Sequence, residues 1–178
     1  MFFPFFRRVL HRVRMPLEIE HRFLVCPRKL PRPLPPGRRI EQGFLSLDPV
    51  VRVRVTTPPR GKPQAWLTVK GHGLRVREEF EYAVPVAEAR RLLKHCGHRR
   101  ILKTRMNLGR WECDRYHGRH RGLWTAEIEL PSPRARLPKH LPEWLGPEVT
   151  HDPRFTNARL AEAGRWPKNL RQTTHGNP

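Results

Sequence analysis

The chain has 178 residues, and 36 lysines and arginines against 16 aspartates and glutamates give it a formal net charge of +20. No stretch reaches the roughly 18–20 consecutive apolar residues that span a bilayer as a helix. The three cysteines, Cys26, Cys96 and Cys113, are far apart and odd in number, which argues against a disulfide scaffold and a CxxC zinc site. These features favour a cytoplasmic protein with a polyanionic partner.

The two ends of the chain differ from its middle. Residues 1–14, MFFPFFRRVLHRVR, place aromatic residues before arginines, whereas a secretory signal has the opposite order and a longer apolar core. This segment is either an interfacial anchor or an extension from an upstream start codon, with the natural chain opening at Met15, and we favour the extension. We expect residues 166–178 to form a flexible tail, which leaves residues 15–165 as one domain.

Between these ends, apolar residues recur with a period of two, which is typical of β-strands. The alternating segments are Leu17–Val25, 40–46, 50–55, 65–71, 74–84, 101–107, 111–117 and 125–130, with 40–46 and 111–117 the weakest. Short gaps with Gly or Pro separate most of them, which favours antiparallel pairing because parallel strands need long crossovers. Eight such strands predict a closed antiparallel barrel.

Few segments have helical character. Residues 86–96 follow Pro85 and consist of good helix formers, and residues 153–163 follow Asp152, a suitable N-cap. A third short helical piece is allowed near 137–145. The fold class is therefore mainly β (α+β), with a few peripheral helices around the barrel.

The alternation alone is compatible with two opposite barrels. In one, the apolar faces form the core and the charged faces meet water, which is the usual arrangement; in the other, the charged faces line the lumen. The charges are segregated by strand, with acids at Glu18, Glu20, Glu127 and Glu129 and bases at Arg52, Arg54, Lys70, Lys103 and Arg105. A solvated face more often mixes charges along each strand, so the pattern favours a charged lumen.

A lumen of this kind has a definite chemistry. Carboxylates at positions i and i+2 of a strand point the same way, about 6.5–7 Å apart, and two facing pairs would offer hard oxygen ligands that suit Mg²⁺ or Mn²⁺. Neighbouring arginines and lysines would bind phosphate oxygens, and buried cations are best tolerated when an anion fills the site. Phosphoryl transfer to water needs little more than this positioning and charge neutralisation.

The segment EIEHRFLV at the first strand resembles the ExExK signature of the CYTH domains, the triphosphate tunnel metalloenzymes. The resemblance continues in order from Met15 to about Gly164, through IEQGFLS, VRVR, AWLTVKG, REEFEY, ILKTR, WECD, GLWTAEIEL and EWLGPEVTHDPRFTNARLA. One motif would be weak, but blocks in register over nearly the whole domain are specific. The resemblance implies an eight-stranded antiparallel barrel, open as a tunnel, with the charges inside.

The resemblance also implies roles for individual residues. The metal ligands would be Glu18, Glu20, Glu127 and Glu129; the phosphate-binding bases Arg22, Arg52, Arg54, Lys70, Arg77, Lys103 and Arg105; and the catalytic candidates Lys70, Glu79 and Glu81. Asp152 and Arg154 match a block on the C-terminal helix. Family members cleave or cyclise triphosphates with Mg²⁺ or Mn²⁺, and the short bacterial members, which this chain resembles most, are often inorganic triphosphatases.

Two positions depart from the family pattern. The ExExK lysine is Arg22, a poor proton carrier, and the tyrosine of the QGYLS block is Phe44, which makes thiamine triphosphate a less suitable substrate. Lys70, made more acidic by neighbouring cations, could still act as a base.

We therefore expect an enzyme that hydrolyses inorganic tripolyphosphate. The alternatives are an adenylate cyclase or a nucleoside or thiamine triphosphatase of the same family, and a catalytically impaired polyphosphate-binding module. The expected partner is a small-molecule triphosphate, with no specific nucleic acid and no membrane span, and the chain is expected to be a monomer or a homodimer.

Overall fold

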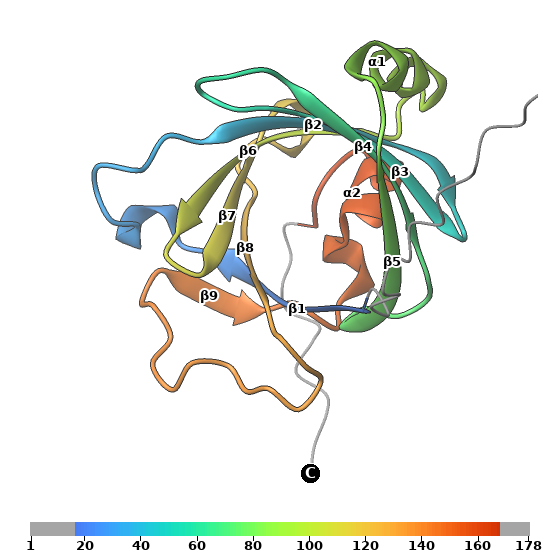
Figure 1. The fold of residues 1–178 in the computed structure, drawn as a ribbon. Helices are drawn as coiled ribbons and strands as arrows, with labels where there is room; N and C mark the ends of the chain where they lie inside the picture. The colour runs from blue at the N-terminus through green and yellow to red at the C-terminus, as the bar shows by residue number, and fades with distance from the viewer. Residues whose placement is uncertain (1–16, 168–178) are drawn as a thin grey trace, which may run out of the picture.

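The computed structural model describes residues 17–167, which form a closed β-barrel with two α-helices (Figure 1). The strands are β1 Leu17–Val25, β2 Arg38–Leu47, β3 Val50–Thr57, β4 Gln64–Lys70, β5 Val76–Ala83, β6 Arg100–Leu108, β7 Trp111–Tyr116, β8 Trp124–Glu129 and β9 Leu145–Glu148. The helices are α1 Val86–His95 and α2 Asn157–Ala163, with 3₁₀ turns at Pro27–Lys29, Gly118–His120 and Pro153–Phe155. The expected extension 1–14 and residues 168–178 of the expected tail lie outside the described residues.

All strand pairings in the described part are antiparallel, in the order β5-β4-β3-β2-β6-β7-β8-β1-β9. Strand β1 closes the barrel because it pairs with β8 on one side and with β5, the first strand of this series, on the other. Its first residues pair with β5, as in Glu18 opposite Arg77, and its later residues pair with β8, as in Glu20 opposite Glu129. Eight strands thus surround the lumen, and β9 pairs with the second half of β1, at Phe23 and Val25. This confirms the predicted fold.

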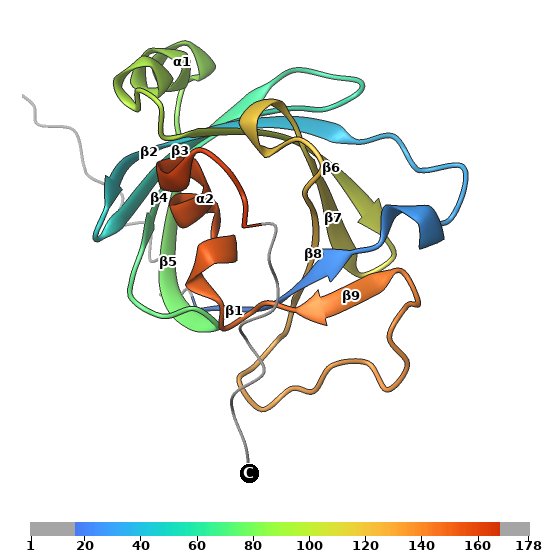
Figure 2. The ribbon, with the colours of Figure 1, turned by 180° about the vertical axis from the view of Figure 1, so that it is seen from behind.

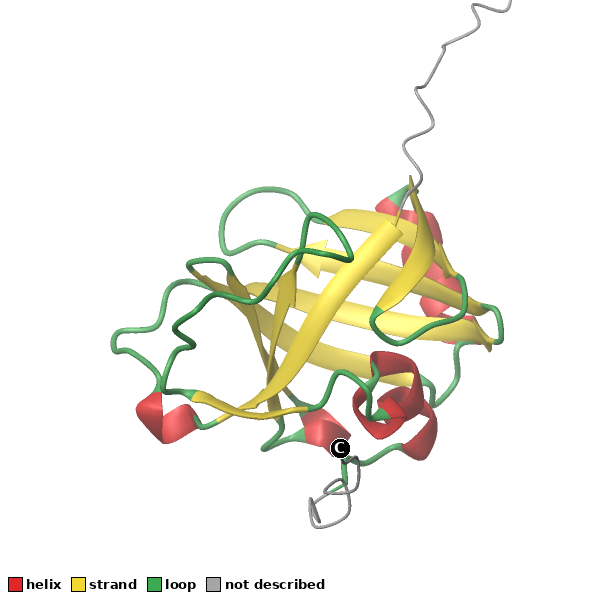
Figure 3. Ribbon diagram, turned by 90° about the horizontal axis from the view of Figure 1, so that it is seen from below, coloured by secondary structure: helices red, strands yellow, loops and turns green. Residues whose placement is uncertain are grey.

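The helices cover different parts of the barrel. Helix α1 packs on the outer face of β2, β3 and β4, where its buried Ala89 and Leu93 meet Val53, Val55 and Ala65. Helix α2 lies at one mouth of the barrel (Figures 2 and 3), against β2 and β6. None of the helices among residues 17–167 has the length and apolar character that crossing a bilayer requires.

The charged side chains point inward, as the segregated pattern favoured. The buried polar residues include Glu20, Arg22, Arg52, Lys70, Lys103, Arg105, Asp114 and Glu127. The apolar faces of the same strands are covered by helices, loops and β9. In one such cluster, Phe23 packs edge-on against Trp111, and Trp111 packs edge-on against Trp144. The solvated-face alternative is therefore excluded.

The predicted elements differ from the structure in the C-terminal third. No helix forms near 137–145; the strand β9 begins at Leu145 and pairs with β1 across Phe23 and Val25. The predicted helix 153–163 is divided at Thr156, whose extended backbone interrupts it and whose side chain accepts a hydrogen bond from the backbone N–H of Arg159. Asp152, the predicted cap, accepts from the Arg154 N–H at 3.1 Å and so caps the preceding 3₁₀ turn.

Candidate active site

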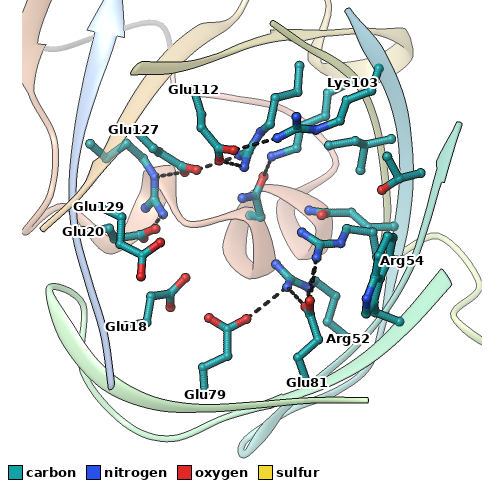
Figure 4. A pocket seen from close by; sticks show the side chains of 18 of the residues that line it. Glu18, Glu20, Arg52, Arg54, Glu79, Glu81, Lys103, Glu112, Glu127 and Glu129 are labelled. Carbon is teal, nitrogen blue, oxygen red and sulfur yellow. Dashed lines mark hydrogen bonds and ion pairs between the residues drawn. The ribbon is translucent and has the colours of Figure 1, made fainter. Parts of the chain in front are cut away.

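The lumen holds a cavity of about 730 Å³ whose wall is mainly charged or polar (Figure 4). The structure places every site residue predicted from the sequence on this wall: Glu18, Glu20, Arg22, Arg52, Arg54, Lys70, Arg77, Glu79, Glu81, Lys103, Arg105, Glu127 and Glu129. They come from strands β1, β3, β4, β5, β6 and β8. The barrel thus gathers side chains that lie far apart in the sequence.

The strand register places these residues in rows. On β1 and β8, Arg22 lies opposite Glu127. On β4 and β5, Lys70 lies opposite Glu79, and Thr68 opposite Glu81. Because side chains directly opposite one another on adjacent strands are near neighbours, each row brings a cation or a hydroxyl group beside a carboxylate.

Glu18 is held by two cations near the closure of the barrel. The Lys70 Nζ donates to both carboxylate oxygens at 2.8 and 2.9 Å, and the Arg77 Nε donates to Oε2 at 2.7 Å. Burial by itself would raise the pKa of Glu18, but Lys70 and Arg77 lower it to about 2. The pKa of Lys70 is lowered by burial and by the nearby Arg52 and Arg77. The two groups therefore form a buried ion pair.

Glu127 lies between two guanidinium groups. The Arg22 Nε donates to its Oε1 at 2.7 Å, and the Arg105 Nη2 donates to its Oε2 at 2.7 Å. Burial would raise the pKa of Glu127, but these arginines hold it well below its ordinary range. Arg22 is only 3% exposed and also donates to Glu20. Both oxygens of Glu127 are thus used to neutralise buried arginines.

Glu20 and Glu129 have a different electrostatic setting. They face each other across β1 and β8, and burial raises the pKa of both carboxyl groups. Glu127 and Glu18 raise the pKa of Glu20 further, and Glu18 and Glu112 do the same for Glu129. Glu129 forms no ion pair with the other described residues. Glu20 is paired with Arg22 and Arg77, whereas Glu129 is the carboxylate of this part of the wall that lacks a cationic partner among residues 17–167 (Figure 4).

On the opposite wall, Arg52 and Arg54 are arranged by the acids of β5. The Arg54 Nη2 donates to both oxygens of Glu81 at 2.9 and 3.1 Å, while Arg52 donates to Glu79 at 3.2 Å. The Nε atoms of Arg52 and Arg54 are buried and have no hydrogen-bond partner among the described residues. Burial and then Glu18 raise the pKa of Glu79, despite the opposing effect of Lys70.

A third cationic group surrounds Asp114, which is 0% exposed. Arg105 donates to it in a two-pronged contact at 2.6 and 2.7 Å, and the Lys103 Nζ donates to it at 2.6 Å. Burial and then Arg105 lower the pKa of Lys103 to about 8, despite the opposing effect of Asp114. Asp114 thus fixes two bases that the sequence places on the wall of the cavity.

Several residues in or behind this wall were not predicted from the sequence. Arg38, Gln42, Glu112 and Asn157 line the cavity, and Asp114, which lies in the WECD block but was given no role, is buried behind the wall. Gln42 is 1% exposed, and its Nε2 has no partner among the described residues. Its inward position follows from pairing with Arg54 across β2 and β3, so the period-two pattern of residues 40–46 was the available signal.

The chemistry of the carboxylates fits a divalent metal ion. Oxygen ligands suit Mg²⁺ and Mn²⁺, and a cation beside Glu20 and Glu129 would oppose the burial and the carboxylate repulsion that together raise their pKa values. Glu18 lies near them, although Lys70 and Arg77 occupy its oxygens. Among residues 17–167, no group of three or more His, Cys, Asp or Glu side chains is arranged to hold a metal as the structure stands. The carboxylates therefore suit these metal ions by the kind of ligand atom that they offer, and not by their present arrangement.

Comparisons with known proteins give a consistent result. The chain is 37% identical over 153 residues to an inorganic triphosphatase of Acetivibrio thermocellus, covering 82% of this chain and 93% of that protein. It is 30% identical over 154 residues to an inorganic triphosphatase of Nitrosomonas europaea, covering 81% and 96%. A solved crystal structure of an inorganic triphosphatase superposes with a TM-score of 0.55 at 28% identity, covering 81% of this chain and 93% of that one. No family model matches the chain.

Proposed function

The chain belongs to the inorganic triphosphatase family, and on this premise we propose that it hydrolyses inorganic tripolyphosphate to pyrophosphate and phosphate inside the barrel. We further propose that it is a triphosphate tunnel enzyme of the CYTH type that uses Mg²⁺ or Mn²⁺. The observation that supports this most strongly is the set of basic side chains that line the cavity together with carboxylates: Arg22, Arg52, Arg54, Lys70, Arg77, Lys103 and Arg105.

A chain of phosphates would be bound by the basic side chains of the lumen. Arg52 and Arg54 lie on β3, and Gln42 lies opposite Arg54 on β2, so the three side chains line one part of the wall. Guanidinium groups bind phosphate oxygens through paired N–H donors. Lys103 and Arg105 add positive charge on the neighbouring strand β6, so the three phosphates can be neutralised along the lumen.

Lys70 and Glu79 are the groups best placed to handle a proton. The Lys70 Nζ lies 3.3 Å from Glu79 Oε2. Burial and then its cationic neighbours lower the pKa of Lys70, and burial and then Glu18 raise the pKa of Glu79, so both values move toward neutrality. A water oxygen forms the new bond to the terminal phosphorus, the bridging P–O bond breaks with its electron pair leaving on pyrophosphate, and the water proton passes to Glu79 or Lys70.

The other carboxylates of the lumen either orient basic side chains or would hold the metal. Glu81 accepts from Arg54 and from the Thr68 hydroxyl at 3.0 Å, so it orients Arg54. Glu127 orients Arg22 and Arg105. Glu20 and Glu129 would hold the metal, with Glu18 beside them. When bound, the metal neutralises charge on the phosphates and stabilises the charge that develops in the transition state.

The two departures from the family pattern fit this assignment. Arg22 is surrounded by Glu20 and Glu127, so it serves charge balance, which needs no proton transfer. Phe44 is 2% exposed in an apolar cluster with Ile101 and Leu160.

We also propose a cytoplasmic location, supported by the free thiols of the chain's cysteines.

The test is a substrate panel on the purified chain. Tripolyphosphate, pyrophosphate, ATP and thiamine triphosphate are each incubated with Mg²⁺ or Mn²⁺, and phosphate and cyclic nucleotide are measured together. We expect rapid phosphate release from tripolyphosphate, a large loss in Glu129→Gln, and no loss in the control Glu143→Gln, which changes an exposed carboxylate outside the cavity. Cyclic AMP as the main product would indicate a cyclase, and tight binding without turnover would indicate an impaired binding module.

A further inference from the structure

We propose that a second cleft, outside the barrel, binds a nucleotide. This C-terminal cleft has a volume of about 960 Å³ and lies between the Gly118–His120 turn, the Pro153–Phe155 turn and the end of α2. None of the residues assigned to the triphosphatase site lines it. Its volume falls in the range of about 300–1,000 Å³ that is typical of small-molecule sites.

The rim of the cleft is rich in arginine. Arg119, Arg121 and Arg165 line it and form no ion pair with other described residues. Arg159, on α2, donates to Glu162 at 2.6 Å, and Glu162 is the only carboxylate among the lining residues that the structure describes. The cleft therefore carries uncompensated positive charge. Guanidinium groups bind phosphate oxygens through paired N–H donors, so phosphate is the anion that this rim suits best.

The wall of the cleft is apolar and includes an aromatic ring. Gly164 ends α2 with a left-handed φ of 66°, which turns the chain back so that Trp166 lies beside the Gly118–His120 turn. The Trp166 Nε1 donates to the Arg121 carbonyl at 3.3 Å. This hydrogen bond fixes the indole while leaving the side chain only partly buried. Pro153 and Ala163 extend the apolar surface.

An aromatic surface beside guanidinium groups matches the two parts of a nucleotide. The base can stack on the Trp166 indole, because every nucleobase offers a flat π-face, and the phosphates can reach the arginines. An inorganic phosphate chain would leave the apolar wall uncovered. Binding should also be independent of metal, since the cleft, unlike the tunnel, has no unpaired carboxylate among its described lining residues.

The test measures ADP binding to the full chain by isothermal titration calorimetry in the presence of EDTA. We expect one ADP per chain, at least a tenfold weaker affinity in Trp166→Ala and in Arg165→Gln, and near-normal affinity in Trp166→Phe, which keeps an aromatic face. Arg91→Gln, which changes an exposed arginine on α1, is the matched control and should bind as the wild type does. Circular dichroism checks that each variant is folded.

The same titration separates the cleft from the tunnel. Arg52→Gln changes the tunnel wall and should leave ADP binding in EDTA unchanged, and the cleft variants should keep tripolyphosphatase activity. The proposal is overturned by absence of ADP binding, by loss of binding in Arg52→Gln, or by a Trp166→Ala variant that binds as the wild type does. Binding of a single-stranded oligonucleotide but not of ADP would also overturn it. None of these results depends on whether the chain hydrolyses tripolyphosphate.

Discussion

Replacement by glutamine should lower the stability of the chain at Glu127 but the effect of metal on stability at Glu129. The two residues lie on one strand and were predicted to share one role. Glu127 accepts from Arg22 and Arg105 at 2.7 Å each, inside the protein. Removing one partner of a buried ion pair costs about 3–5 kcal/mol, so Glu127→Gln should lower the free energy of unfolding by about that amount. The melting temperature should fall on the order of 10 °C.

Glu129→Gln should leave stability nearly unchanged without metal. Folding raises the pKa of Glu129 through burial and through Glu18 and Glu112, so the folded protein disfavours its charge and a neutral amide costs little. The assay is urea denaturation in EDTA at pH 7, repeated with Mg²⁺. A bound ligand at about 100 times its Kd adds about 2.7 kcal/mol; Glu127→Gln should keep most of this increment, and Glu129→Gln should lose it.

Two results would refute this reasoning. One is a Glu127→Gln variant as stable in EDTA as the wild type, since it would mean that the arginines do not depend on that carboxylate. The other is a Glu129→Gln variant that loses stability in EDTA yet keeps the full Mg²⁺ increment, since it would assign the metal to other residues. The denaturant slope of each variant should match that of the wild type, which ensures that the same unfolding reaction is compared.

Three further predictions concern other parts of the barrel. Because the pKa of Glu18 is about 2 in the folded chain and near 4.5 otherwise, its stabilising effect is present above pH 4.5 and is lost as the pH falls toward 2; urea midpoints across this range should therefore fall less steeply in Glu18→Gln. Gln42→Leu should raise the KM for tripolyphosphate several-fold, since it replaces a polar side chain of the cavity wall with an apolar one, and an unchanged KM in steady-state assays would exclude a role for Gln42 in substrate binding. Gly43→Ala should destabilise the chain by about 1–3 kcal/mol, because the new Cβ would lie 2.6 Å from Cys96 Sγ and 2.8 Å from Cys96 Cβ; thermal denaturation should show partial recovery in the double variant with Cys96→Gly, which removes both atoms, and no recovery would contradict the assigned clash.

The sequence was sufficient to predict the strands of the barrel, because each carries its own period-two pattern. In Leu17–Val25, the alternation that places Glu18, Glu20 and Arg22 on one face is visible without any partner strand. The pattern could not decide whether that face is inside or outside, since both arrangements alternate identically. The resemblance to a known family supplied that choice, and the buried Arg22 bears it out.

The missed elements have local causes. Strand β9, Leu145–Glu148, is short and contains Gly146 and Pro147, so it shows no alternation; it forms because β1 offers an edge. The split of the C-terminal helix depends on Thr156, a residue that can cap a helix or lie within one.

The pairing of charges inside the lumen could not be predicted from the sequence. The pattern places Glu127 and Glu129 on the same face and assigns them one role, whereas their partners come from other strands. Glu127 forms ion pairs with Arg22 of β1 and Arg105 of β6. Glu129 instead lies near the carboxylates of Glu18 and Glu112, which raise its pKa. Such differences depend on closure of the barrel, which brings β1 beside β8, and on how far each side chain reaches across the lumen.

The most direct test of the proposed activity is a ³¹P NMR time course of tripolyphosphate with the purified chain and Mg²⁺. We predict that the tripolyphosphate signals are replaced by pyrophosphate and phosphate in equal amounts, that EDTA stops the reaction, and that Arg52→Gln slows it strongly while Arg91→Gln does not. Unchanged tripolyphosphate with either metal, or an equal rate in Arg52→Gln and the wild type, would contradict the assignment of hydrolysis to the charged lumen.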